Sequence, residues 1–421
     1  MIDIDASVPA LLVRIGRYPI HAGSLGVART LGSLGVPVYA LVEGRFTPLA
    51  RSRQLAGAFS WRGDEPDDLV EQVCAIAGTL GRRAVAVATD DDAAILLAEN
   101  ADRLAPHLLL PPVAPDLPRR LASKRDLYEL CLAHEVPTPL TLCPASAADL
   151  EACGDELGYP LVAKNALAAT GKTAVRGTTV VRDRRELRAR FAGLPDFSAL
   201  LLQEHIPFEG DNDWFVHAYC DTGAQPAVTF VGRKAYAWPP ARGITADARS
   251  ADNAELRELS AGFFKALHYS GVNDLDWRYD RRDRRYKLVD FNPRVGAQFR
   301  FGVTTAGVDV VRALHLDLTG RPAPAGDQDH RRRLVVENVY PAARLGHRRA
   351  GLPAPAAAPA GSRTAGAWRE GSAGDPVPLV VMIATVAWRA ARGLVHALIH
   401  RSRAERTATS TPWDARQLED Q

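Results

Sequence analysis

Oxygen-bearing side chains that could bind a metal recur between residues 271 and 296, in the stretch GVNDLDWRYDRRDRRYKLVDFNPRVG. Two strand-like segments, LDWRYD and RYKLVDFN, flank a charged turn, and this pattern predicts a β-hairpin. Asp276 lies on the first strand, whereas Asp290 and Asn292 lie two residues apart on the second and share one face. Such oxygens are the ligands that Mg²⁺ prefers, usually with water and phosphate oxygens. The hairpin therefore predicts a magnesium site suited to ATP; the alternative is that its acids pair with the neighbouring arginines.

Several basic residues stand where they could hold phosphate groups. Lys164 ends the apolar strand YPLVAKN, where a lysine has no role in packing. Lys124 precedes a predicted helix, and Lys234 follows the strand-like stretch AVTFVGR. Arg294, two residues beyond Asn292, could bring a guanidinium to the same phosphates. Taken singly, each lysine is more simply explained as a surface residue.

The segment ALAATGKTAVRG, which follows Lys164, has few large side chains. Its backbone amides could wrap a triphosphate, so Gly171 and Lys172 are candidate nucleotide contacts. The segment also contains A-x-x-x-x-G-K-T (166–173), one residue away from a P-loop motif. A P-loop requires a helix directly after the lysine, but TAVRGTTVV is β-branched and strand-like. The sequence therefore disfavours a P-loop kinase or GTPase.

Two further segments could contact ligands. The apolar strand LLLQEHI ends in Gln203 and Glu204, and its backbone could offer groups to an adenine edge. Asp213 or Glu209, shortly after this strand, could hold the ribose hydroxyls. The proline-stiffened loop AWPPARGITADARS carries Arg242, which could meet a carboxyl substrate or a phosphate.

The elements that must position these residues change in character along the chain. Residues 1–118 alternate strand-like and helical patterns, which predicts a parallel, doubly wound α/β sheet. Ligands bind such sheets at the carboxyl ends of the strands, where His21 and Asp91 lie; these two residues are either substrate contacts or helix caps. Residues 119–340 form an α+β region with more antiparallel pairing.

The C-terminal part has a different composition. Residues 341–376 are rich in proline, alanine and glycine and are expected to form a loose linker. Residues 377–404 are expected to form an amphipathic helix, followed by a polar, disordered tail at 405–421. The polar positions of the helix form one stripe on an otherwise apolar surface: Thr385, Arg389, Arg392, His396 and His400. Such a helix could lie at a membrane interface through 379–400, or pack into the protein or a homodimer contact.

Composition excludes some classes of function. A net charge of +3 over 421 residues is too small to indicate nucleic-acid binding. The five cysteines are scattered without a C-x-x-C pair, which favours a reducing cytoplasm over a disulfide framework. There is no secretory signal and no apolar run of about 20 residues, so we expect a cytoplasmic protein that could lie peripherally at the inner membrane face.

Taken in order, these pieces resemble the ATP-grasp superfamily over roughly residues 10–320. The resemblance implies an N-terminal pre-ATP-grasp domain at 1–118, a lid lobe at 119–200 and a catalytic lobe at 201–340. It also implies a role for each matching residue: Lys124, Lys164 and Lys234 on phosphates, Gln203, Glu204 and Ile206 at the adenine, Asp276, Asp290 and Asn292 on the metal, and Arg294 at the end of N-P-R. Two features depart from the family: the lid loop lacks a run of glycines, and Asp290 stands where glutamate is usual.

The resemblance implies an ATP- and Mg²⁺-dependent ligase, for which Mn²⁺ could substitute. It would join a small carboxylate to an amine through an acyl phosphate and release ADP and phosphate. Two alternatives stay open: an ATP-grasp synthetase or carboxylase whose nucleophile is not an amino acid, and a non-catalytic nucleotide-binding regulator. An NAD-dependent Rossmann enzyme is disfavoured because G-x-G-x-x-G is missing after the first strand.

Overall fold

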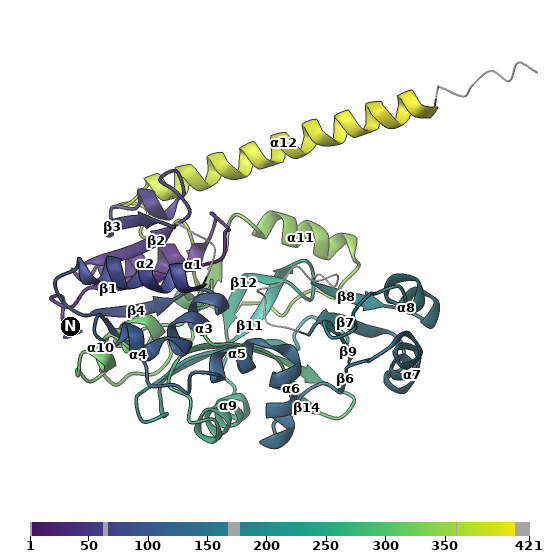
Figure 1. Cartoon of the computed structure of the whole chain (residues 1–421), viewed down its shortest axis with the longest axis horizontal. Helices are drawn as coiled ribbons and strands as arrows, with labels where there is room; N and C mark the ends of the chain where they lie inside the picture. The colour runs from purple at the N-terminus through teal and green to yellow at the C-terminus, as the bar shows by residue number, and fades with distance from the viewer. Residues whose placement is uncertain (1, 62–65, 167–176, 359, 409–421) are drawn as a thin grey trace, which may run out of the picture.

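The computed structural model describes residues 2–61, 66–166, 177–358 and 360–408 of the chain. Within this part, the backbone forms an N-terminal α/β domain, two further lobes and a long C-terminal helix (Figure 1). Gly171 and Lys172, and the end of the predicted tail from 409 onward, lie outside the described residues.

The N-terminal domain is a parallel five-stranded sheet in the order β3-β2-β1-β4-β5. Its strands are β1 (Ala10–Val13), β2 (Val38–Val42), β3 (Leu55–Ser60), β4 (Ala84–Ala88) and β5 (Leu108–Leu109). The helices that connect them are α1 (Ala22–Gly32), α2 (Pro66–Gly78), α3 (Asp91–Glu99) and α4 (Ala101–Leu104). Apolar residues occupy both faces of β1, as expected for a strand covered by helices on two sides. The predicted α/β fold of this region is confirmed.

The small lobe is a four-stranded antiparallel sheet in the order β6-β9-β7-β8. It contains β6 (Thr141–Leu142), α7 (Ala147–Leu157), β7 (Leu161–Asn165), β8 (Thr178–Val181), α8 (Arg184–Phe191) and β9 (Leu200–Glu204). Because β9 pairs with β7, the boundary between the lobes falls after Glu204 and not at residue 200 as we predicted. The strand LLLQE could not be assigned to a lobe from its sequence, since apolar strands of either sheet look alike.

The large lobe contains a seven-stranded sheet in the order β14-β13-β10-β11-β12-β15-β16. Its strands are β10 (Asp213–Cys220), β11 (Pro226–Trp238), β12 (Ile244–Ser250), β13 (Gly271–Asp280), β14 (Arg285–Asn292), β15 (Arg332–Val335) and β16 (Arg363–Gly366). One face packs against α5 (Leu117–Ala122), α6 (Lys124–Ala133) and α9 (Ala254–Ala266), and the other against α10 (Val310–Leu318) and the N-terminal domain.

The alternation along β10 illustrates this division. Trp214 and Val216 belong to the cluster under α5, α6 and α9, whereas Phe215 and Tyr219 belong to the cluster shared with the N-terminal domain. A strand places successive side chains on opposite faces, so this apolar pattern fixes which polar residues of the sheet face the N-terminal domain.

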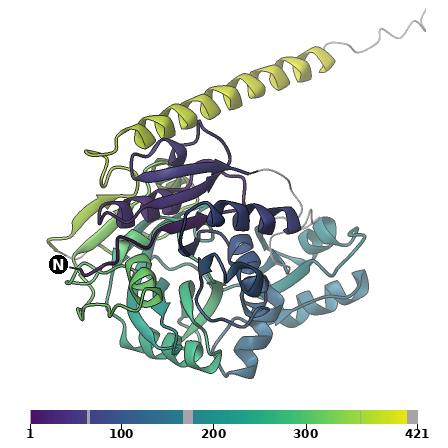
Figure 2. The ribbon, with the colours of Figure 1, turned by 60° about the vertical axis from the view of Figure 1, so that its left-hand side comes forward.

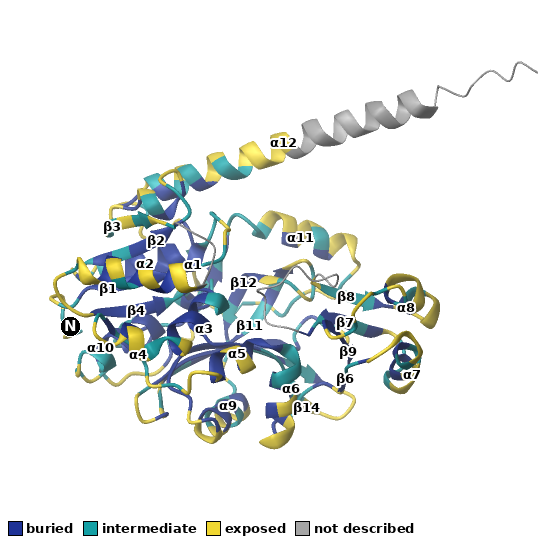
Figure 3. Cartoon of the chain, in the orientation of Figure 1, coloured by how far each residue is buried: buried dark blue, intermediate teal, exposed yellow. Residues whose placement is uncertain are grey.

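The predicted loose linker at 341–376 is wrong. This stretch contains most of α11 (Tyr340–Arg349) and the whole of β16, which pairs in parallel with β15. Trp368 and Asp375 are completely buried (Figure 3 shows the burial along the chain). The proline- and alanine-rich composition of the segment conceals these two anchors, whose partners lie far away in sequence.

The last element, α12 (Val377–Ala408), extends a few residues beyond the predicted 377–404. It leaves the body beside the N-terminal domain and continues past it as a single straight helix (Figures 1 and 2). Among the described residues, no helix is both long and apolar enough to cross a membrane.

Candidate active site

The acidic residues of the predicted hairpin meet across two strands. β13 and β14 are antiparallel neighbours, and Asp276 lies directly opposite Asp290. Asp274 lies opposite Asn292 one pair further along, and the register shifts at the step from Asp276 to Trp277. The four polar residues therefore share the sheet face that looks away from α5, α6 and α9. The predicted hairpin is present, and Asp276, Asp290 and Asn292 lie on one face of it.

Two lysines from other elements lie against these carboxylates. Lys124, the first residue of α6, forms an ion pair with Asp290. Lys234, on β11, places its Nζ 2.5 Å from Oδ2 of Asp276. Each acid thus has its own lysine, and the two pairs lie side by side on the hairpin.

Burial and these neighbours shift the pKa values of the four groups in different directions. Burial would raise the pKa of Asp290, but the Lys124 ammonium outweighs it, so the pKa of Asp290 is lowered. The pKa of Asp276 is raised, because burial and the nearby carboxylates outweigh Lys234. Burial would lower the pKa of both lysines, but their acidic partners raise it. Asp290, Lys124 and Lys234 therefore stay charged at neutral pH.

Both lobes contribute to a cleft of about 590 Å³ above the hairpin. This volume is in the range of small-molecule binding sites. Its lining includes most of the predicted nucleotide and substrate residues: Lys124, Lys164, Gln203, Glu204, Ile206, Asp213, Lys234, Arg242, Asp276 and Asp290. Lys124 and Asp290, which are more than 160 positions apart in the sequence, thus line the same cleft.

Lys164 enters this cleft from the small lobe. Its Nζ donates to Oε1 of Gln203 at 2.7 Å, and the Gln203 amide in turn donates to the Thr141 hydroxyl at 2.9 Å. Burial lowers the pKa of Lys164 to about 8. A desolvated lysine that donates to a neutral amide, as Lys164 does among the described residues, is well placed to receive an anionic group.

The side chains predicted for the adenine and the ribose already have strong partners. Glu204 accepts from Lys287 at 2.8 Å and from Arg282 at 3.0 Å. The Asp213 carboxylate is held by the Arg278 guanidinium, at 2.5 and 2.9 Å. Arg278 also donates to the carbonyl of Ile206 at 3.0 Å. These contacts stiffen the floor of the cleft. Arg242, by contrast, is exposed at the rim.

Arg294 lies beside the hairpin, where three oxygens surround its guanidinium. It is 3.1 Å from Oδ2 of Asp274, 2.8 Å from Oδ1 of Asn292 and 3.3 Å from Oδ1 of Asp91. Asp91 belongs to the N-terminal domain, at the start of α3. Burial alone would lower the pKa of Arg294, but Asp91 and Asp274 raise it, so the guanidinium stays charged.

The two candidate substrate residues of the N-terminal domain differ in role. His21 is the N-cap of α1 and accepts from the backbone N–H of Ser24 at 3.1 Å. Of the two alternatives for His21, the structure contains the helix cap. The cap of α3 is Asp90, whose side chain accepts from Ala93, so the carboxylate of the next residue, Asp91, faces Arg294.

Comparisons with known proteins agree with this architecture. No family model matches the chain. D-aspartate ligase of Enterococcus faecium is 24% identical over 238 residues, which are 54% of this chain and 56% of the ligase. Pyruvate carboxylase of Aspergillus niger is 24% identical over 215 residues, 46% of this chain and 17% of that protein. The chain therefore matches about half, or less, of the length of these curated relatives.

Solved structures resemble the chain over a larger share. Carboxyaminoimidazole ribonucleotide synthase of Aspergillus clavatus, complexed with ATP, has a TM-score of 0.58 and 15% identity, covering 76% of this chain and 79% of that one. The biotin carboxylase domain of Hydrogenobacter thermophilus 2-oxoglutarate carboxylase, solved with MgADP and bicarbonate, has a TM-score of 0.55 and 16% identity, covering 76% and 71%. The chain has the ATP-grasp fold.

The ATP-grasp fold implies magnesium, and the hairpin residues fit it. Asp276 and Asp290 offer two carboxylates, and Asn292 offers an amide oxygen, although that oxygen now accepts from Arg294. Within the described ranges, no three His, Cys, Asp or Glu residues converge as a metal cage. Mg²⁺ is commonly held by one or two carboxylates with phosphate oxygens and water as further ligands. The carboxylates in this cleft thus suit a metal that has phosphate oxygens and water among its ligands.

Sequence reasoning missed two buried residues beside the hairpin acids, Asp274 and His217. The His217 ring on β10 is completely buried, and its Nε2 lies 2.8 Å from Oδ1 of Asp274. Burial would raise the pKa of Asp274, but His217 and Arg294 outweigh it and hold this pKa far below its usual value. Asp274 shares a strand face with Asp276 two residues away, which was the available signal.

Proposed function

We propose that the protein is an ATP- and Mg²⁺-dependent ligase that joins a carboxylate to an amine through an acyl phosphate. The observation that supports this most is the cleft in which two facing carboxylates, Asp276 and Asp290, lie among Lys124, Lys164 and Lys234. Acids for a metal and separate cations for phosphates are what phosphoryl transfer requires, because catalysis there is mainly positioning and charge stabilisation.

In this mechanism, a substrate carboxylate oxygen attacks the γ-phosphorus of ATP. The bond between the γ-phosphorus and the β,γ-bridging oxygen breaks, which releases ADP and leaves an acyl phosphate. Lys164 and Lys124 hold phosphate oxygens. Lys234 lies beside the carboxylate of Asp276. Asp276, Asp290 and Asn292 would hold Mg²⁺, which supplies charge neutralisation on the phosphates when it is bound.

The second half of the reaction forms the C–N bond. The amine attacks the acyl carbon, the C–O bond to phosphate breaks, and the amine proton leaves to a base or to water. Arg294 stabilises the negative charge that develops on the acyl oxygen or on the departing phosphate. Three oxygens fix its guanidinium, so little reorganisation is needed when this charge appears.

The comparisons favour an amino acid as one substrate and bicarbonate as a second candidate acid. A D-aspartate ligase is among the proteins that the chain resembles in sequence. The biotin carboxylase domain that it resembles in fold was solved with bicarbonate. With bicarbonate, the same steps would carboxylate a nitrogen nucleophile.

A screen for ADP release tests the proposal. The purified full chain is incubated with Mg²⁺, ATP and pairs of amines with small carboxylates, including D- and L-amino acids and bicarbonate. We expect at least one pair to raise ADP release well above that with ATP alone. ¹⁸O in the carboxylate of that acid should then appear in the released phosphate. AMP and pyrophosphate as products, or phosphate without the label, would contradict an acyl phosphate.

We also propose a cytoplasmic location at the inner membrane face, and a homodimer. All five cysteines are free, as expected in a reducing compartment. The biotin carboxylase domain with a similar fold was solved as a dimer. Light scattering of the purified chain tests the oligomeric state: twice the 45.5 kDa chain mass supports the dimer, and the chain mass alone removes it.

A further inference from the structure

The C-terminal helix α12 has only part of its surface covered by the protein. Leu379, Met382 and Val386 pack against the core, and Met382 is 3% exposed. These positions recur at steps of three and four and therefore form one face of the helix. Beyond them the helix runs on past the body, as both views of the ribbon show (Figures 1 and 2).

The opposite face of α12 is apolar and open to solvent. Val380 is 62% exposed, Ile383 55% and Trp388 58%. The small residues between them are exposed too: Ala384, Ala387 and Ala391. At 100° per residue, this stripe lies across the helix axis from Met382. In the sequence, Leu394 and Leu398 continue the same spacing. An apolar stripe of this length on a helix that leaves the body is typical of an interaction surface.

Most charges on this helix are positive. Arg389 and Arg392 are exposed, and the Arg392 guanidinium lies 4.9 Å from the centre of the Trp388 ring. Over the length of α12 the sequence has five arginines and one acid, Glu405. A second copy of this helix would bring arginines against arginines. A surface of anionic lipids would instead complement them, because its negative potential attracts basic residues that lie close to it.

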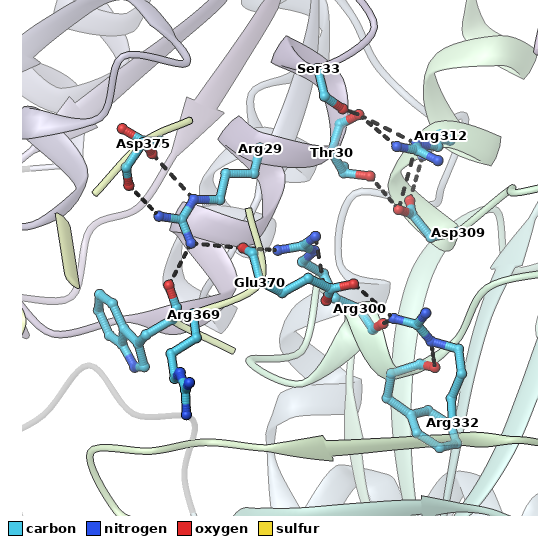
Figure 4. Close-up of polar contacts among 12 residues, drawn as sticks. Arg29, Thr30, Ser33, Arg300, Asp309, Arg312, Arg332, Arg369, Glu370 and Asp375 are labelled. Atoms are coloured by element: carbon cyan, nitrogen blue, oxygen red, sulfur yellow. Dashed lines mark hydrogen bonds and ion pairs between the residues drawn. The ribbon is translucent and has the colours of Figure 1, made fainter. Parts of the chain in front are cut away.

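The root of the helix is fixed to the body (Figure 4). Asp375, two residues before α12, accepts from the Ser52 hydroxyl at 2.7 Å and from the backbone N–H of Arg53 at 2.8 Å. Arg29 of α1 donates to the Asp375 carboxylate at 3.2 Å and to its carbonyl at 2.8 Å. Because these groups are buried, the body sets the direction of the helix and keeps its apolar stripe facing outward.

We propose that α12 docks the protein on an anionic lipid surface, with Val380, Ile383 and Trp388 among the acyl chains and its arginines at the headgroups. The helix would lie in the plane of the membrane, since the described helices include none that could span it. The proposal goes beyond the ligase function: no catalytic step depends on it, and its test needs neither ATP nor substrate.

Vesicle flotation of the full chain is the direct test. Vesicles of phosphatidylcholine alone are compared with vesicles containing about 30% phosphatidylglycerol, at about 0.1 M salt, where charges within roughly 10 Å still interact. We expect the protein to float with the anionic vesicles only, and to be released at 0.5 M salt. Ile383→Glu and the pair Arg389→Glu with Arg392→Glu should each lower the bound fraction at least about tenfold.

Matched variants on other helices separate this surface from general effects of charge. Leu132→Glu replaces a leucine of α6 that is 58% exposed, and Arg185→Glu with Arg188→Glu makes the same change of charge on exposed positions of α8. Both controls should bind as the unmodified chain does. The proposal is wrong if the unmodified chain stays at the bottom of the gradient with both kinds of vesicle. It is also wrong if the Ile383→Glu variant binds anionic vesicles as well as the unmodified chain does. If the unmodified chain binds no vesicles but forms a dimer, and Ile383→Glu dissociates that dimer, the stripe contacts a second copy of the chain and the lipid proposal is wrong.

Discussion

Asp276 and Asp290 lie directly opposite each other on β13 and β14, and each is paired with a lysine from a different element. Two facing carboxylates repel each other unless cations stand between or beside them. Lys234 reaches Asp276 from β11, and Lys124 reaches Asp290 from α6. A metal and a polyphosphate can replace these pairings with equivalent ones, the acids on the metal and the lysines on the phosphates.

Asp290→Ala should abolish ATP turnover and leave the fold intact. Asp290 and its partner Lys124 are both partly exposed, so we expect the free energy of unfolding to change by about 1 kcal/mol or less. ADP release at saturating substrate and thermal unfolding measure the two effects. Asp283→Ala removes an acid from the turn of the same hairpin and should keep full turnover. Turnover by Asp290→Ala at the unmodified rate would show that the metal assignment is wrong.

Nucleotide affinity should fall as the pH rises above about 8. Burial lowers the pKa of Lys164 to about 8, so its ammonium is present below that pH and is lost above it. If only the charged form binds phosphate, the ADP dissociation constant is flat below pH 8 and rises about tenfold per pH unit above it. Calorimetric titrations of ADP between pH 6 and 10 measure this. Lys164→Arg keeps its charge over this range and should remove the rise of the ADP dissociation constant above pH 8. If the constant of this variant still rises about tenfold per pH unit, a group other than Lys164 is responsible.

Asp274→Asn should destabilise the protein markedly. It removes the charge that faces both His217 and Arg294, and breaking a buried ion pair on one side costs about 3–5 kcal/mol. The pKa of Asp274 is held below its usual value, so this stability is present at neutral pH and is lost as the pH falls through the folded-state pKa. Denaturant unfolding at pH 7 measures the loss. The matched change Asp252→Asn, at an exposed pair with Arg257, should stay within about 1 kcal/mol, and equal effects would contradict our account.

Asp375→Ala should loosen the root of α12. The carboxylate is fully buried and holds Arg29, so its loss leaves an uncompensated buried charge that costs about 3–5 kcal/mol. Relative to the unmodified chain, hydrogen exchange of the variant should speed up more in residues 363–386 than in the rest of the protein. Asp116→Ala, which removes an exposed partner of Arg120, serves as the control. Unchanged exchange at the root would show that apolar packing, and not this ion pair, fixes the helix.

The hairpin could be predicted because its signals are local. Alternating polar residues on two strands around a charged turn indicate which side chains share a face. The sequence did not show which acid of β13 stands opposite Asp290, since the register shifts beside Asp276 and spacing alone does not locate such a shift. Asp274 was missed although it shares a strand face with Asp276, because its partners His217 and Arg294 come from other parts of the chain. His217, a single histidine in an apolar strand, acquires its role only from a residue on the neighbouring strand.

The C-terminal segment could not be predicted because its anchors are non-local. Trp368 and Asp375 lie in a stretch whose composition is typical of a linker. Their partners on α1 and in the N-terminal domain are more than 320 residues away. By contrast, the strand–helix alternation of the N-terminal domain arises within short windows, and the parallel sheet was predicted correctly.

The effect of Mg²⁺ on ADP binding tests the central claim most directly, since it needs no knowledge of the substrate. ADP is titrated into the full chain by calorimetry, with Mg²⁺ and with a chelator in its place. We predict that Mg²⁺ tightens binding by at least about tenfold, equal to roughly 1.4 kcal/mol, and that this gain disappears in the Asp276→Ala, Asp290→Ala double variant. A gain from Mg²⁺ that survives in the double variant would contradict the assignment of the metal to this hairpin.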